Sequence, residues 1–147
     1  MTYGSGMVAP DIEEWTMVEF INPPSMFSNP AYSQAVIIPA GARTMLIGGQ
    51  NAVATDGSIV GVGDLAAQSK KAIENLIACL ETAGGDVTNL VQVTLNFKGD
   101  IDIMPGYLEW AKVWGKRANA PTVNAAKVLG LARPELLVEI SAIAVLP

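Results

Sequence analysis

One carboxylate interrupts an apolar run near the end of this 147-residue chain. Glu139 stands within residues 136–145, which are otherwise almost entirely apolar and typical of a strand buried on both faces. An ionised carboxylate is costly to bury unless a cation, a hydrogen-bond donor or water meets it. Glu139 is therefore either half of a salt bridge at a strand edge or subunit interface, or a carboxyl held in a small pocket for acid–base work. Because side chains alternate along a strand, its expected companions on one face are Leu137, Ser141 and Ile143.

Composition excludes several other kinds of site. The sequence has no histidine and one cysteine, Cys79. Nucleophiles paired with histidine are therefore excluded, as are an internal disulfide and a clustered-cysteine zinc site. Cys79 lies at the edge of a helical apolar stripe, where a small buried hydrophobe is the ordinary interpretation and a nucleophile the alternative. We predict no metal and no cofactor.

Charge and hydropathy limit the partners. The net charge is −5 and the pI is about 4.6, which disfavours a nucleic-acid partner because phosphate binding needs a clustered basic surface. No apolar run approaches the ~18 residues of a membrane helix, so we expect no membrane span, and the absence of a signal-like N-terminus favours the cytoplasm. Half of the residues are hydrophobic and 16% are charged. This apolar surplus predicts a subunit interface and hence an oligomer.

Two further patterns leave alternatives open. Gly48 and Gly49 end a strand-like segment, where paired glycines serve a bulge or let a ligand approach the bare backbone. Tyr107, Trp110 and Trp114 follow helical spacing, which is more typical of core packing than of a ligand site.

Periodicity and turn signals then give the elements. We expect a loose tail over residues 1–14 and a single domain over residues 15–147, with an α+β fold in which two helices pack on one face of a single sheet. A loop at residues 39–43 is expected to join two strands as a hairpin. The expected strands are residues 15–21, 32–38, 44–47, 90–97, 122–128 and 136–145, and the helices are residues 64–83 and a segment opening at Asp102 and Pro105.

Several segments together resemble one protein family. Residues 29–36 (NPAYSQAV) are similar to a G-P-Y-S-Q-A-V segment, residues 48–50 (GGQ) to an S-G-Q strand end, and residues 139–144 (EISAIA) to an E-I-E-A-I-A finish. These are features of the RidA family, also called the YjgF or L-PSP endoribonuclease family. The resemblance extends from about Trp15 to Pro147. It implies a chorismate-mutase-like fold and a homotrimer that binds a small-molecule ligand in clefts between subunits.

The resemblance also implies a chemistry. The best-known members hydrolyse reactive enamines and imines to a 2-keto acid and ammonia. Their site pairs an arginine with the substrate carboxylate, while a glutamate on the last strand, a tyrosine and backbone groups handle the proton and water. Carried onto this chain, the catalytic glutamate is Glu139, the tyrosine is Tyr32 and the strand-end backbone is that of Gly48.

The chain departs from this pattern at the positions that bind the substrate. The arginine position falls on Val123, next to Asn124, and a family asparagine on the second helix is replaced by Met104. Valine cannot form a bidentate clamp on a carboxylate. We therefore expect a pocket that is drier than that of the deaminases. Its expected substrate-binding residues are Gly48, Met104, Val123 and Asn124. A cation from elsewhere would have to come from Arg43, Lys127 or Arg133.

Three functions remain at this point. The first is hydrolysis of small imines or enamines, with Glu139 moving protons. The second is an arginine-less relative that binds or transforms a different, neutral carbonyl-type ligand, without 2-aminoacrylate deaminase activity. The third, a ribonuclease or translation inhibitor, is disfavoured by the acidic charge and the absence of histidine.

Overall fold

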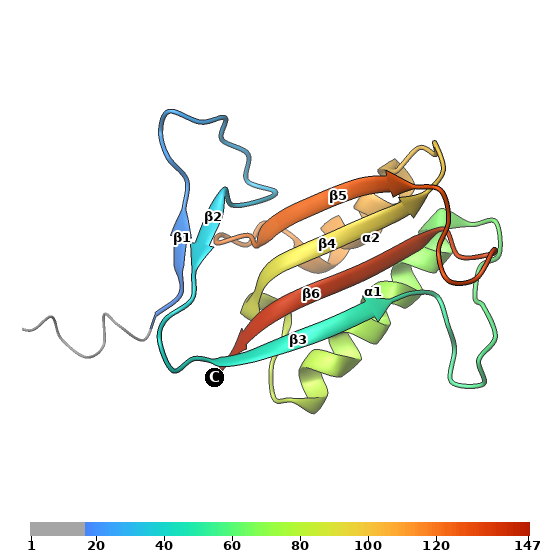
Figure 1. The fold of residues 1–147 in the computed structure, drawn as a ribbon, viewed down its shortest axis with the longest axis horizontal. Helices are drawn as coiled ribbons and strands as arrows, with labels where there is room; N and C mark the ends of the chain where they lie inside the picture. The colour runs from blue at the N-terminus through green and yellow to red at the C-terminus, as the bar shows by residue number, and fades with distance from the viewer. Residues whose placement is uncertain (1–16) are drawn as a thin grey trace, which may run out of the picture.

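The computed structural model describes residues 17–147, so the expected tail and the first residues of the expected first strand lie outside the described residues. Along the chain the elements are β1 (Glu19–Ile21), β2 (Ala35–Ile37), β3 (Arg43–Gln50), α1 (Leu65–Thr82), a short 3-10 helix η2 (Val87–Asn89), β4 (Leu90–Lys98), α2 (Met104–Trp114), β5 (Thr122–Val128) and β6 (Val138–Leu146) (Figure 1).

The main sheet has the strand order β3-β6-β4-β5. The nine-residue strand β6 lies inside it and pairs antiparallel with both β3 and β4, while β5 is a parallel edge strand on β4. Figure 1 shows α1 and α2 behind the sheet, both on the same face, and no helix in front of it. The expected α+β architecture with two helices on one face is therefore confirmed. We call the face without helices the open face.

The expected hairpin between residues 32–38 and 44–47 is wrong. β2 has only three residues and pairs antiparallel with β1, in a separate two-stranded sheet, and β3 pairs with β6 instead. The physical reason is the length of the apolar ladder that β6 offers: β3 pairs with it from Arg43 to Gln50 and buries Ile47 there. A loop signal shows where a chain turns but not which strand it meets next.

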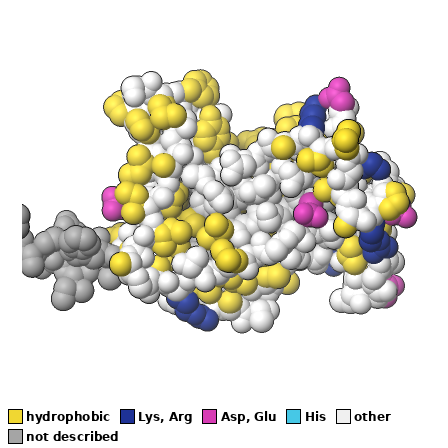
Figure 2. Space-filling view, viewed as in Figure 1, with side chains coloured by type: hydrophobic (Ala, Val, Ile, Leu, Met, Phe, Trp, Pro, Cys, Tyr) yellow, Lys and Arg dark blue, Asp and Glu magenta, His cyan; other side chains and the backbone are white. Residues whose placement is uncertain are grey.

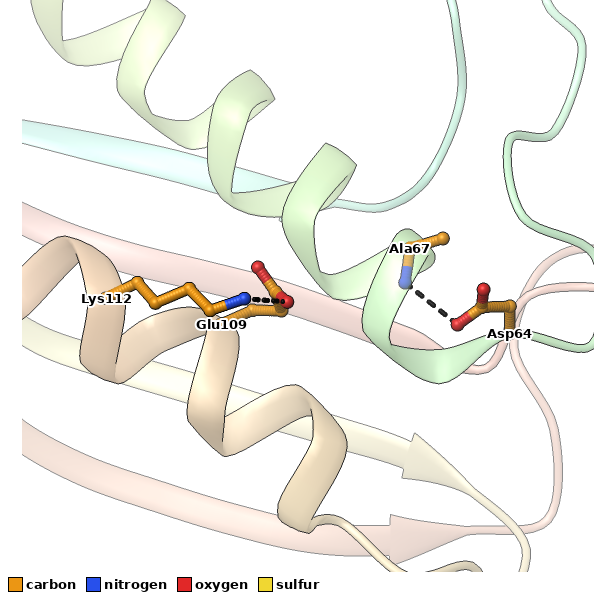
Figure 3. A network of polar contacts seen from close by, with 4 residues as sticks. All are labelled: Asp64, Ala67, Glu109 and Lys112. Carbon is orange, nitrogen blue, oxygen red and sulfur yellow. Dashed lines mark hydrogen bonds and ion pairs between the residues drawn. The ribbon is translucent and has the colours of Figure 1, made fainter.

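The first helix forms as its sequence predicts. The side chain of Asp64 accepts a hydrogen bond from the backbone N–H of Ala67 at 3.0 Å, which caps the N-terminus (Figure 3). Gly84 follows the last turn with a φ of +81°, a left-handed conformation that glycine adopts without strain. Ile73, Leu76 and Leu80 are buried against the sheet, as their spacing requires.

The second helix carries Pro105 in its first turn, where the missing N–H breaks no helical hydrogen bond. Glu109 and Lys112, one turn apart, form an ion pair of 2.7 Å, in which the Lys112 side chain is exposed and the Glu109 side chain is largely buried (Figure 3). Trp110 and Trp114 stack with their ring centroids 5.9 Å apart, and Trp114 is buried in the core. The aromatic stripe therefore belongs partly to the core, as expected. None of the helices in the described part of the chain is long and apolar enough to cross a membrane.

Strand β6 alternates strictly between a buried and a half-exposed side chain. Its buried residues face the helices, and no helix of residues 17–147 covers its other face. The expectation that this strand is buried on both faces is therefore wrong for the single subunit, because both helices lie on the same side of the sheet. The residues of β6 on the open face are Glu139, Ser141, Ile143 and Val145, whereas Leu137, which was expected with them, lies just before the strand and packs against the buried core.

Candidate functional site

Glu139 lies on the open face, half-buried, directly across from Asn96 of β4. The next pair along the same two strands on this face is Ser141 and Thr94. Asn96 thus lies opposite the carboxyl group at cross-strand distance, where side chains of paired residues contact one another, and Ser141 lies two residues along β6 on the same face. The open face is otherwise poor in charge near its centre, since Figure 2 shows most basic and acidic side chains toward the ends of the molecule.

The paired glycines form a bulge beside this carboxyl group. The register of β3 on β6 slips between Ile47 and Gln50, so Gly48 and Gly49 interrupt the ladder. A Cβ atom built on Gly49 would overlap the carboxyl group of Glu139, whereas one on Gly48 would meet nothing within 4 Å. The bulge interpretation is confirmed, and Gly49 is the glycine that lets the acid lie against the backbone of β3.

No cation meets Glu139 in residues 17–147 of this chain, where the two ion pairs are Lys112–Glu109 and Lys127–Asp100. The three expected sources of a cation are engaged elsewhere. Arg43 donates to the carbonyl oxygen of Ala83 at 3.5 Å and Arg133 to that of Gly57 at 2.8 Å. Lys127 contacts Asp100 at 2.7 Å, and this hydrogen bond lowers the pKa of the Asp100 carboxyl.

A cavity of about 180 Å³ lies on the other side of the sheet, between its inner face and the two helices. Val123 lines it, because β5 places Val123 beside Val93 on the helix side of the sheet. Tyr32, from the loop before β2, also lines it. The hydroxyl of the neighbouring Ser33 donates to the carbonyl oxygen of Ala120 at 2.6 Å and ties that loop to the start of β5. No charged residue lines this cavity.

A second hollow of about 280 Å³ adjoins the cavity and shares Ala31, Tyr107 and Trp110 with it. This hollow carries two cationic side chains, Lys116 and Arg117. The Arg117 guanidinium donates to the carbonyl oxygens of Val113 and Trp114 at 2.8 and 2.6 Å, so it is held at the C-terminus of α2. Only Lys116 is left as a cation near the cavity.

The expected site residues therefore fall into two groups. Tyr32 and Val123 meet in the cavity on the helix side, whereas Glu139 and Gly48 lie on the open face, as does Asn124, which pairs with Thr94. Met104 begins α2, is 50% exposed and does not line the cavity, although its neighbour Ile103 does. Within one chain the sheet separates the acid from the cavity.

The structure adds two residues to the expected site residues. Ser141, which was expected only to share a strand face with Glu139, lies on the open face two residues after it, and it stands where the E-I-E-A-I-A finish has its second glutamate, which was a usable signal. Ser69 lines the cavity and is 2% exposed. Its position four residues before Ile73 on the buried stripe of α1 could have placed it.

Comparisons with known proteins agree with this architecture. The model of the family described as Endoribonuclease L-PSP matches residues 25–146. A rat protein named 2-iminobutanoate/2-iminopropanoate deaminase is 34% identical over 115 residues, which cover 78% of this chain and 80% of that protein. A Rid-family protein of unknown function from Yersinia pestis has a TM-score of 0.77 at 30% identity, over 88% of this chain and 98% of that one.

A putative endoribonuclease from Thermotoga maritima has the same fold, with a TM-score of 0.65 at 25% identity over 86% of this chain and 92% of that one. The four-stranded sheet with two helices on one face is thus the architecture that this chain shares with these structures. This chain belongs to the Endoribonuclease L-PSP family, the family also called RidA or YjgF.

Proposed function

We propose that this chain hydrolyses the C=N bond of a small, uncharged imine or enamine. The observation that carries the proposal is the cavity lined by Tyr32 and Val123, which has no charged lining residue. The rat relative is named for two imines that carry a carboxylate, 2-iminobutanoate and 2-iminopropanoate. The family relationship supports hydrolysis of a C=N bond. The uncharged cavity supports a substrate that lacks the carboxylate.

Electrostatics favours the uncharged substrate. A carboxylate placed against Val123 would be buried without a cation, and an uncompensated buried charge costs several kcal/mol. A neutral molecule of the same size incurs no such penalty and packs its hydrocarbon part on the apolar wall. A cost of several kcal/mol for the buried carboxylate corresponds to a preference of ~100-fold or more for the neutral substrate.

Glu139 supplies the proton transfers in this proposal. A carboxyl group can donate a proton to the imine nitrogen and, once ionised, accept one from the water that attacks the carbon. The balance is one imine and one water giving one carbonyl compound and one ammonia. Asn96 and Ser141, which flank the carboxyl group on the open face, would orient the water.

The proposal includes a homotrimer in which the site lies between subunits. The acid and the cavity lie on opposite faces of the sheet in one chain, so a neighbouring copy must bring its Glu139 to the cavity. The open face suits burial against other copies, because Leu46 is 76% exposed there and its cross-strand partner Ile143 is half-exposed.

The test compares two imines made in situ by an oxidase, one neutral and one 2-iminobutanoate. Semicarbazide traps whatever imine the protein has not hydrolysed. The wild type should hydrolyse the neutral imine at least ~100-fold more efficiently, and Val123→Arg should reverse the preference by adding a bidentate clamp. Val123→Met, which adds bulk without charge, is the matched control and should leave the preference unchanged.

Two results would contradict this proposal. One is a wild type that prefers 2-iminobutanoate, with a preference that Lys116→Gln removes, since the cation of the neighbouring hollow would then be the clamp. The other is failure to accelerate hydrolysis of any neutral imine. In that case the second candidate function is binding without chemistry, which the separation of Glu139 from the cavity within one chain favours. Neutral carbonyl compounds would then raise the melting temperature of wild type and Glu139→Gln equally.

A further inference from the structure

The cavity on the helix side contains one polar group that nothing in the described chain satisfies. Ser69 is 2% exposed, lines the cavity, and its Oγ has no hydrogen-bond partner within residues 17–147. Buried side-chain hydroxyls are nearly always hydrogen-bonded, because losing water without gaining a partner is unfavourable. An unsatisfied hydroxyl at the wall of a cavity indicates that a ligand in the cavity supplies the missing hydrogen-bond partner.

The helix itself does not supply the missing partner. A serine or threonine inside a helix commonly donates to the carbonyl oxygen four residues earlier. Thr82 on the same helix does so, with Oγ1 donating to the carbonyl oxygen of Ala78 at 2.8 Å. Ser69 makes no such bond to Leu65, so its hydroxyl is left for the cavity.

The neighbouring helix leaves the hydroxyl uncovered. Gly106 of α2 packs against Ser69, and a Cβ atom on Gly106 would lie 2.8 Å from the Ser69 Oγ. Any larger residue at position 106 would cover the hydroxyl or displace it. Ser69 is also the only side chain lining the cavity that is both polar and more than nine-tenths buried; the apolar wall around it includes Ile73, Phe97 and Val138.

The shape and polarity of the cavity select its occupant. A cavity of 150 Å³ lined by apolar side chains binds benzene, so about 180 Å³ has room for ~six to eight non-hydrogen atoms. A buried water needs two to four polar partners, whereas Ser69 is the one polar side chain of the lining that is more than nine-tenths buried. An organic molecule with a single hydrogen-bond acceptor meets both conditions.

We propose that Ser69 is the specificity-determining hydrogen-bond donor of this cavity, and that the ligand is a small uncharged molecule with one carbonyl oxygen on a hydrocarbon body. The carbonyl oxygen accepts a hydrogen bond from the Ser69 hydroxyl, and the body packs on the apolar wall. This inference rests on the proposed function, because a carbonyl compound is the product of the hydrolysis proposed for the same cavity. It adds Ser69 as the residue that forms a hydrogen bond to the acceptor atom of the ligand.

The test uses two probes of equal shape, cyclohexanone and methylenecyclohexane, each with seven non-hydrogen atoms. Calorimetric or NMR titration of the wild-type protein should show cyclohexanone binding about tenfold more tightly, the value of one buried hydrogen bond. Ser69→Ala should abolish this preference, with methylenecyclohexane bound at least as tightly as by the wild type. Thr82→Ala, which removes a satisfied hydroxyl from the same helix, should leave the preference intact.

Stability provides a second readout. Removing an unsatisfied buried hydroxyl should leave the urea midpoint of Ser69→Ala unchanged or raised. The inference is overturned if Ser69→Ala keeps the preference for cyclohexanone, or if neither probe binds the wild type. Imine hydrolysis can persist in either case, so failure here is distinguishable from failure of the proposed function.

Discussion

Gly49 lies so close to the carboxyl group of Glu139 that a methyl group on its Cα would overlap that carboxyl. This contact fixes where the acid sits relative to the β3 backbone. A methyl group on the adjacent Gly48 would meet nothing within 4 Å, so the two glycines have different roles although they are neighbours. Proton transfer depends on such placement at the scale of 1 Å.

Gly49→Ala should therefore lower the rate of neutral-imine hydrolysis by at least ~10-fold, because the carboxyl group is displaced from its position. Gly48→Ala is the matched control and should keep the rate within about twofold, since its added methyl group meets nothing. The measurement is kcat/KM in the semicarbazide assay, with circular dichroism to confirm that both variants fold. Equal losses in the two variants would show that the bulge, rather than the contact with Glu139, matters.

The sequence allowed some of these residues to be predicted. Glu139 is conspicuous as the one acid in an apolar strand, and Val123 as a departure from a recognisable pattern. The contact between Gly49 and Glu139 could not be predicted, because it depends on where the register of β3 slips along β6. The unsatisfied hydroxyl of Ser69 depends on the approach of α2 in the same way.

At the scale of elements, periodicity predicted which side chains share a strand face but not which face the helices cover. The alternation along β6 and β4 is confirmed, with Glu139 and Asn96 together on one face. Whether residues of two different strands face the same side depends on how the strands pair in the sheet, and no local sequence pattern determines that pairing. Val123 and Glu139 consequently face opposite sides of one sheet. The wrong hairpin between β2 and β3 has the same cause.

The short helix η2 gives an element-scale prediction about pH. The side chain of Asp86 caps it by accepting hydrogen bonds from the hydroxyl and the backbone N–H of Thr88, and these lower the pKa of Asp86 below its usual 3.8. A carboxyl whose pKa is depressed by folding stabilises the protein above its unfolded pKa, and this stabilisation is lost as the pH falls through the folded pKa. Thr88→Val removes the largest cause of the shift.

The free energy of unfolding of the wild type should therefore fall between pH 5 and pH 3, and the fall should be smaller in Thr88→Val. Urea denaturation at the two pH values measures this difference. Thr82→Val is the control, because the hydroxyl of Thr82 bonds a backbone carbonyl and no carboxylate. Identical losses in the wild type and Thr88→Val would contradict the role given to Asp86.

At the scale of the whole molecule, the order of strands and helices and the placement of both helices on one face followed from sequence pattern. Part of the apolar surplus lies on the open face of the sheet, where Leu46 is 76% exposed and no helix of residues 17–147 covers it. One chain thus holds a cavity on one side of its sheet and an acid on the other. A complete site, in our account, takes the cavity from one copy and Glu139 from the next.

Mixing two inactive variants tests this claim most directly. Glu139→Gln removes the acid and keeps the cavity, whereas Val123→Phe fills the cavity and keeps the acid; each alone should lose neutral-imine hydrolysis. When equal amounts are unfolded together and refolded, random assembly of a cyclic trimer should restore about a quarter of the wild-type sites, namely those that combine an intact cavity with a neighbour's Glu139. A mixture that stays inactive, although both variants fold and assemble, would contradict a site shared between subunits.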